Sequence, residues 1–310
     1  MATNGHRPVL LEESLQALAI RPDGVYLDAT FGRGGHARAI LARLGASGRL
    51  LVLDRDPEAV AEARSLMERD PRLLVEQAPY STLLEVVRRH GLNGAIDGLL
   101  LDIGVSSPQL DDPRRGFSFM IDGPLDMRMD NSGGETAAEW LARTTEGEIV
   151  RVLREYGEER FASRIAHGIV RGRQQAPILT TARLAQLIAT ASPSREPGKH
   201  PATRSFQAIR IHINRELDEL AACLASVRDL LALRARLVVI SFHSLEDRIV
   251  KRFIRDQARG EQLPRGVPIR SHTRPSWLRA VGKPIHASLA EIAANPRARS
   301  AVMRVAERLV

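Results

Sequence analysis

The chain has little cysteine, few aromatic residues and no long apolar segment. Cys223 is its only cysteine, which excludes an internal disulfide and any scaffold held together by disulfides. Even the longest purely apolar runs are short, such as Leu50–Leu53, which excludes a helix that spans a bilayer. The first residues also lack the apolar core of a signal peptide. These absences predict a soluble protein of the cytoplasm.

What remains is an ordinary globular composition. Of the 310 residues, 44% are hydrophobic and 26% are charged, which excludes disorder along the whole chain. The length is about twice that of a common domain of about 150 residues. It predicts two domains, or one large domain that carries an insertion.

Positive charge is concentrated near the C-terminus. The chain has a net charge of +8, and the segment from Arg248 to Val310 holds 14 basic and 4 acidic residues. The preceding residues are close to neutral. A basic segment on a neutral body indicates a polyanionic partner such as nucleic acid, with a solvated surface as the alternative.

The first hundred residues alternate between strand and helix patterns. Strands are predicted over residues 24–28, 49–54 and 97–102, and helices over 37–44 and 57–67. Such alternation is typical of a parallel α/β sheet.

The alternation stops after Gly104 and resumes late in the chain. Helical patterns cover 146–156, 158–173 and 181–191, and the apolar positions from Phe206 to Leu231 fall on one helical face. A strand then returns at 236–242. We therefore expect a sheet domain formed by residues 1–108 and 212–310, and a mostly helical insert of residues 109–211 that binds substrate.

A glycine-rich turn follows the first strand. Gly32, Gly34 and Ala37 fit the pattern G-x-G-x-x-A, and Asp54 lies where a carboxylate binds ribose hydroxyls. This pattern alone fits NAD(P) and S-adenosylmethionine equally.

Acidic residues at strand ends distinguish these two cofactors. Asp28 lies just before the turn, where it would repel a pyrophosphate and attract the ammonium and sulfonium of S-adenosylmethionine. Asp54 and Asp102 end two further strands. The acids favour a cationic cofactor, although strand-end aspartates also cap helices.

The segment from Asp102 to Gln109 lies where methyltransferases of exocyclic amines hold their acceptor. Such an amine needs hydrogen-bond acceptors and in-line positioning against the methyl group, and Asp102, Ser106 and Ser107 are the candidates. By itself, Ser-Ser-Pro is also a simple turn.

A few aromatic and histidine side chains are candidates for substrate binding. Phe117, Phe119 and Phe242 lie in polar contexts and could stack on an unstacked base, or pack in the core. His243 could accept a proton or form a structural hydrogen bond. The histidines show no metal-ligand spacing, so no metal site is predicted.

Long motifs in order along the chain resemble the MraW family of ribosomal RNA small subunit methyltransferases. The matching segments are residues 6–13, 28–36, 54–57, 102–111, 115–119, 123–129, 156–159, 200–211, 241–247 and 295–300. They cover nearly the whole chain.

This resemblance implies a Rossmann-like class I S-adenosylmethionine-dependent methyltransferase with a helical insert. It implies methylation of N4 of a cytidine in the decoding centre of 16S rRNA, with the small ribosomal subunit as partner. The cofactor contacts carried over by motif are Gly34, Gly35, His36, Asp54, Tyr80, Asp102 and Gln109. Tyr80 departs from the phenylalanine that is usual there.

Two other functions remain open from the sequence. An NAD(P)-linked oxidoreductase fits the glycine pattern, and a non-catalytic rRNA-binding assembly factor fits the basic segment. The sequence leaves open the catalytic base, the choice between monomer and homodimer, and whether free rRNA, a precursor particle or the mature subunit is the substrate.

Overall fold

A computed structural model describes residues 8–193, 200–260 and 276–310 of the chain. These residues form two compact units. The first unit combines Met1–Gly104 with Leu217–Val310, and the second is Val105–Glu216. Part of the predicted basic segment, residues 261–275, lies outside the described residues.

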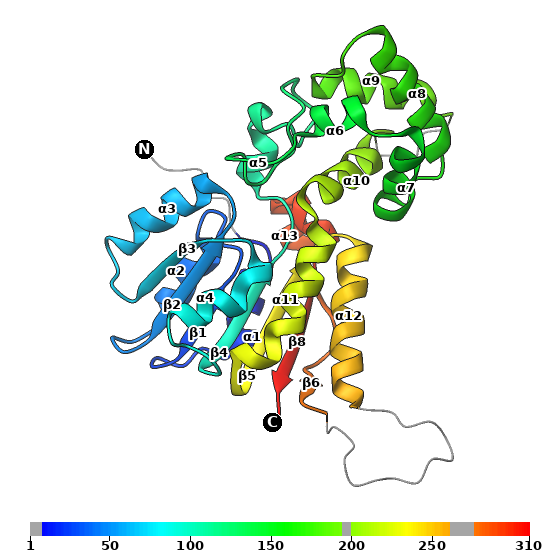
Figure 1. Cartoon of the computed structure of the whole chain (residues 1–310). Coiled ribbons are helices and arrows are strands. Elements are labelled where there is room, and N and C mark those ends of the chain that lie inside the picture. The colour runs from blue at the N-terminus through cyan, green and yellow to red at the C-terminus, as the bar shows by residue number, and fades with distance from the viewer. Residues whose placement is uncertain (1–7, 194–199, 261–275) are drawn as a thin grey trace, which may run out of the picture. The chain divides into compact units, whose positions relative to one another are not determined.

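The first unit is built on one eight-stranded sheet (Figure 1). Its strand order is β3-β2-β1-β4-β5-β8-β6, and β7 pairs with β8. The strands β1 to β5 are parallel, and β8 runs antiparallel to β5. The strand bounds are β1 Val25–Asp28, β2 Arg49–Asp54, β3 Leu73–Gln77, β4 Ile96–Asp102, β5 Leu231–Ser241, β6 Leu278–Ala280, β7 Ile285–His286 and β8 Val302–Arg308.

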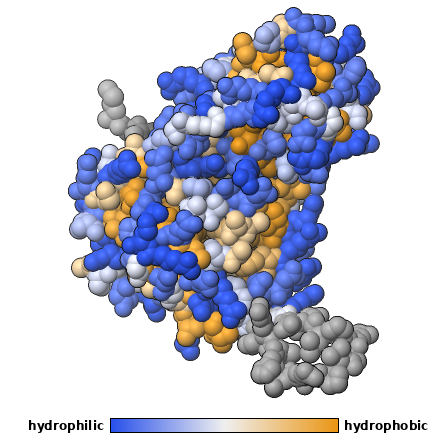
Figure 2. Space-filling model, viewed as in Figure 1, coloured by the Kyte–Doolittle hydropathy of each residue, from blue (hydrophilic) through white to orange (hydrophobic). Residues whose placement is uncertain are grey.

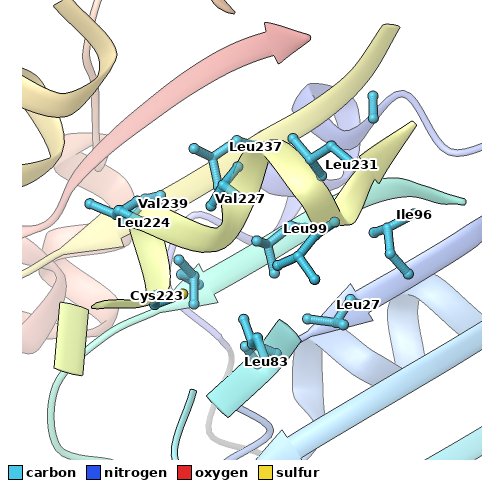
Figure 3. Close-up of a cluster of buried hydrophobic side chains, with 14 of the residues drawn as sticks. Leu27, Leu83, Ile96, Leu99, Cys223, Leu224, Val227, Leu231, Leu237 and Val239 are labelled. Carbon is cyan, nitrogen blue, oxygen red and sulfur yellow. The ribbon is translucent and has the colours of Figure 1, made fainter. Parts of the chain in front are cut away.

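Helices cover both faces of this sheet. They are α1 Leu11–Leu18, α2 Gly35–Leu41, α3 Pro57–Met67, α4 Leu83–Arg89, α11 Glu216–Leu230, α12 Ser244–Arg259 and α13 Leu289–Ala294. Successive strand residues point to opposite faces, so buried apolar runs supply two cores. On one face Leu27, Leu99 and Leu237 pack with α4, α11 and α12, as Figure 3 shows in part. On the other, Tyr26 and Leu100 pack with α1, α2 and α3.

The second unit is mostly helical and has a core of its own. Its helices are α5 Ser107–Asp111, α6 Ala137–Arg143, α7 Glu146–Gly157, α8 Ala162–Gln175, α9 Thr181–Ala191 and α10 Thr203–Asn214. Threonine side chains cap α6, α7 and α9 by accepting a backbone N–H of the first turn, as the preference for threonine at helix starts predicts. Trp140, Ile149 and Ile165 lie in the buried cluster between these helices.

Several predicted elements agree with the structure, and one prediction was wrong. The predicted strand at 49–54 and helices at 57–67 and 181–191 have the observed bounds. The single helical stretch from Phe206 is two helices, because Arg215 adopts a left-handed backbone conformation (φ 51°) and ends α10. Strands β3, β6, β7 and β8 were not predicted. Within the described ranges, no helix has the length and apolar character needed to cross a membrane.

Candidate cofactor-binding site

Three aspartates lie at one edge of the sheet of the first unit. Asp28, Asp54 and Asp102 are the last residues of β1, β2 and β4. Since β1 pairs in parallel with both β2 and β4, the three strand ends are neighbours. The chain order of the strands reverses between β1 and β4, and open α/β sheets bind ligands beyond the strand ends at such a point.

The glycine-rich turn joins β1 to α2 at this edge. Gly34 has a left-handed backbone (φ 70°), and a Cβ atom there would lie 2.5 Å from the Phe31 ring. The Gly32 N–H donates to Oδ2 of Asp54 over 2.8 Å. Only glycine fits at position 34, and the turn is fastened to the end of β2.

Asp28 and Asp102 each have a buried carboxylate oxygen at this edge of the sheet. Asp28 is 1% exposed, and its Oδ1 accepts the Thr30 N–H at 3.1 Å. Its Oδ2, like Oδ1 of Asp102, has no hydrogen-bond partner among the described residues. The Asp102 side chain is 23% exposed, so a ligand can reach it. Unpartnered buried carboxylate oxygens are rare and indicate a binding site.

Burial makes these carboxyl groups weak acids. It raises the pKa of Asp28 to about 7 and that of Asp54 to about 6. It raises the pKa of Asp102 to about 8, and the negative charges of Asp28 and Glu246 add to this shift. A cation bound among them would offset the cost of ionising them. The donor set therefore fits a positively charged ligand.

His36 adds a neutral imidazole to the same edge. It is 5% exposed, and burial lowers its pKa to about 4. Its Nδ1 lies 3.7 Å from Oδ2 of Asp102, but a neutral ring forms no ion pair there. Its Nε2 has no hydrogen-bond partner among the described residues.

The remaining predicted residues of the first unit have structural contacts. Tyr80 starts a 3₁₀ turn, Tyr80–Thr82, and is partly buried against the core. His243 caps α12, where its Nδ1 accepts the Glu246 N–H at 3.4 Å. Oε2 of Glu246 in turn accepts the Phe242 N–H at 2.9 Å.

The other predicted residues lie in the second unit. Ser106 and Gln109 form a capping box at the start of α5, and Oε1 of Gln109 accepts the Ser106 N–H at 2.9 Å. Ser107 is the first residue of α5.

The two predicted phenylalanines of the second unit pack within it. Phe117 is 6% exposed and lies in its core. The Phe119 ring packs against His200 and Phe206, with centroid distances of 4.6 and 4.8 Å. The functional roles of all these residues stay predictions.

A model of the MraW methylase family matches residues 3–309. The chain belongs to the MraW methylase family. It is 62% identical to the ribosomal RNA small subunit methyltransferase H of Thioalkalivibrio sulfidiphilus, over 98% of this chain and 97% of that protein. Proteins of the same name from Thiobacillus denitrificans and Pseudoalteromonas atlantica are 59% and 55% identical, covering 98% of this chain and 97% and 98% of their own lengths.

Membership in the MraW methylase family confirms three expectations. The resemblance, the enzyme class of methyltransferase and S-adenosylmethionine as the cofactor are confirmed with it. The α/β sheet with a strand-order reversal confirms the Rossmann-like fold class.

Two further residues at this candidate cofactor-binding site were not selected from the sequence. Thr30 accepts the Asp102 N–H through Oγ1 at 2.7 Å and so joins the ends of β1 and β4. Glu246 is 2% exposed, and its charge contributes to the raised pKa of Asp102. The spacing His243-x-x-Glu246 is that of a capping box and was the available signal for Glu246.

Proposed function

We propose that this MraW methylase methylates N4 of a cytidine in the decoding centre of 16S rRNA. The relatives named as small subunit rRNA methyltransferases support this substrate. The observation that carries the proposal is the group of Asp28, Asp54 and Asp102 at the switch point, with unpartnered buried oxygens on Asp28 and Asp102. These acids suit a donor that carries a sulfonium and an ammonium.

Different residues at the sheet edge would contact different parts of the cofactor. Asp28 and Asp102 offer negative charge to its cationic part. Asp54, whose oxygens accept the N–H groups of Gly32 and Asp56, keeps lone pairs for the ribose hydroxyls. The turn at Gly34, Gly35 and His36 lets the backbone approach the ligand. When bound, S-adenosylmethionine supplies an electrophilic methyl group.

We assign Asp102 as the group that accepts a hydrogen bond from the substrate amine. The lone pair of an exocyclic amine is delocalised into the ring, and a hydrogen bond from the amine to a carboxylate returns electron density to nitrogen. The same carboxylate would take the amine proton as the N–CH₃ bond forms, the S–CH₃ bond of S-adenosylmethionine breaks and S-adenosylhomocysteine leaves. The partial exposure of Asp102 leaves it accessible for this role.

Both alternative functions are less well supported. A dinucleotide would place its pyrophosphate near Asp28, which has no cationic partner among the described residues. A non-catalytic assembly factor would have no need for these carboxyl groups, which are costly to ionise.

The proposal is tested by methyl transfer from labelled S-adenosylmethionine to small ribosomal subunits that lack the modification, followed by nucleoside analysis. We expect labelled N4-methylcytidine. Free rRNA and precursor particles are assayed in parallel to identify the form that is methylated. No label in any of them, with RNA binding retained, would favour the assembly factor.

A pair of variants in one strand tests the role of Asp102. Asp102→Asn should lower kcat by about 10²- to 10⁴-fold, the usual effect of losing a general base. Asp97→Asn is the control, because Asp97 lies near the opposite end of β4 and accepts the Val25 N–H at 2.9 Å. Full activity of Asp102→Asn would contradict the assignment.

A further inference from the structure

A pocket of 260 Å³ lies in the first unit between α12 and the segment that joins β6 to β7. It is lined by basic and apolar side chains and by backbone: Lys251, Ile254, Arg255, Ala280, Val281, Gly282, Lys283, Pro284, Arg304 and Val305. Among the described residues that line it, there is no carboxylate and no aromatic ring. The outer side of α12 is coloured as hydrophilic in Figure 2.

Its charges are only partly neutralised. Arg304 donates to Asp247 from Nε and Nη2 over 2.6 and 2.9 Å, and Arg255 lies 2.8 Å from Asp256. Lys251 and Lys283 are exposed, and neither forms an ion pair with a described residue. They are two of only three lysines in the chain. The pocket therefore has two ammonium groups that have no carboxylate partner in the described ranges.

Local structure brings these cations together. Lys251 and Arg255 are four residues apart on α12 and share a face with Ile254, which is 5% exposed. Gly282 has a left-handed backbone (φ 69°) in the segment that joins β6 to β7, directly before Lys283. The bidentate pair with Asp247 holds the Arg304 guanidinium in one orientation.

We propose that this pocket binds backbone phosphates of the RNA substrate; this inference rests on the proposed function. Lysine is a point charge that binds phosphate without a fixed geometry, which suits a backbone that passes the pocket. Base recognition needs stacking rings or paired donors and acceptors, and the described residues of the lining include no aromatic or amide side chain. The pocket would then hold the RNA without reading its sequence.

The pocket lies apart from the candidate cofactor site. Strands β4 and β5 separate β1, which carries Asp28, from β8, which carries Arg304. Three strand spacings of about 4.8 Å place β8 roughly 14 Å from β1. RNA bound at both places would therefore extend beyond a single nucleotide.

The test compares RNA affinity at several salt concentrations for the full chain and for Lys251→Ala/Lys283→Ala. Each phosphate contact contributes about 0.7–0.9 to the slope of log Kd against log salt, so losing two should lower it by about 1.5. Extrapolated from 1 M salt, this corresponds to Kd about 30-fold higher at 0.1 M. The KM for RNA should rise, whereas kcat and the Kd for S-adenosylmethionine should not change.

Arg252→Ala/Arg259→Ala is the matched control. Both arginines are exposed on α12, the helix that carries Lys251, and neither lines the pocket. The change of net charge is the same in the two pairs. The conservative variant Lys251→Arg/Lys283→Arg should retain wild-type affinity and slope. An equal effect of the two alanine pairs would overturn the inference.

Two further outcomes distinguish a failure of this inference from a failure of the proposed function. If the wild-type chain neither binds nor methylates rRNA, the proposed function fails. If rRNA affinity is the same in the wild type and the lysine variant, but inorganic phosphate binds only to the wild type, the pocket serves a free phosphate ligand and the inference is wrong.

Discussion

Asp28 is a buried acid without a positive partner in the described part of the chain, and this has a consequence for stability. Its pKa is about 7 in the folded state, compared with an ordinary 3.8. The folded state therefore binds the proton more tightly than the unfolded state. The contribution of Asp28 to stability is most favourable below pH 4, falls as pH rises to about 7, and is constant above that.

We expect Asp28→Asn to stabilise the protein without ligand, by an amount that grows from near zero at pH 4 to a few kcal/mol at pH 7. The measurement is the free energy of unfolding by urea at several pH values. Asp70→Asn should behave oppositely, because hydrogen bonds from Arg72 lower the pKa of Asp70. Its loss should therefore destabilise the protein above about pH 4. A pH-independent effect of Asp28→Asn would contradict the raised pKa.

The pH dependence of catalysis follows from the same group of acids. In the free enzyme Asp102 has a pKa of about 8, so kcat/KM for S-adenosylmethionine should fall below about pH 8. A bound cation favours the ionised carboxylate, and the corresponding fall in kcat should occur at a lower pH. Both profiles can be measured between about pH 5.5 and about pH 9. Profiles with the same apparent pKa would show that the cofactor does not interact with Asp102.

The sequence predicted the three acids at strand ends that the structure brings to one edge of the sheet, but not their ionisation. Their role in binding stays a prediction. Strand-end position and spacing were enough to select Asp28, Asp54 and Asp102. Their raised pKa values depend on burial by residues from several elements, which spacing does not report. In the same way, the residues around Phe117 in the sequence are polar, but its side chain is 6% exposed in the core of the second unit.

At the scale of elements, the start of α12 depends on a reciprocal cap between His243 and Glu246. His243→Ala should lower the free energy of unfolding by about 1 kcal/mol, whereas His243→Asn should retain the cap. Urea unfolding gives the stabilities, and methylation assays of both variants test the predicted substrate role. Wild-type activity of His243→Asn would assign His243 to the cap alone.

The elements that were predicted have strong local signals, and those that were missed lack them. The interior of β2, Leu50–Leu53, is wholly apolar, and Pro57 marks the first turn of α3. In contrast, β8 contains Arg304 and Glu307 and lies in the basic segment from Arg248 to Val310. In the structure Glu307 lies 2.7 and 2.8 Å from Arg236 and Arg279, so part of that basic segment is an ion-paired strand. Such pairing across strands is not visible in local patterns.

At the scale of the whole molecule, each unit contains one buried tryptophan. Trp277 lies in the first unit at 5% exposure and Trp140 in the second at 4%. Trp140→Phe and Trp277→Phe therefore give chains whose fluorescence reports one unit each.

S-Adenosylmethionine at about 100 times its Kd should stabilise the first unit by roughly 2.7 kcal/mol. The shift is measured from Trp277 fluorescence during urea unfolding of Trp140→Phe. Cys223, which is fully buried in the core of the first unit (Figure 3), gives a second report, because its thiol should react only when that unit unfolds. An unchanged unfolding midpoint in the presence of ligand would remove the cofactor site from the first unit.

The division of the sheet between two distant chain segments affects how the protein is made. Strand β4 ends at Asp102 and its neighbour β5 begins at Leu231. At about 5–20 residues per second, a ribosome needs roughly 6–26 s to synthesise the residues between them. During that time the edge of β4 that later pairs with β5 has no partner strand, and the residues of the second unit are synthesised. A nascent chain is therefore most exposed to aggregation after β4 emerges and before β5 does.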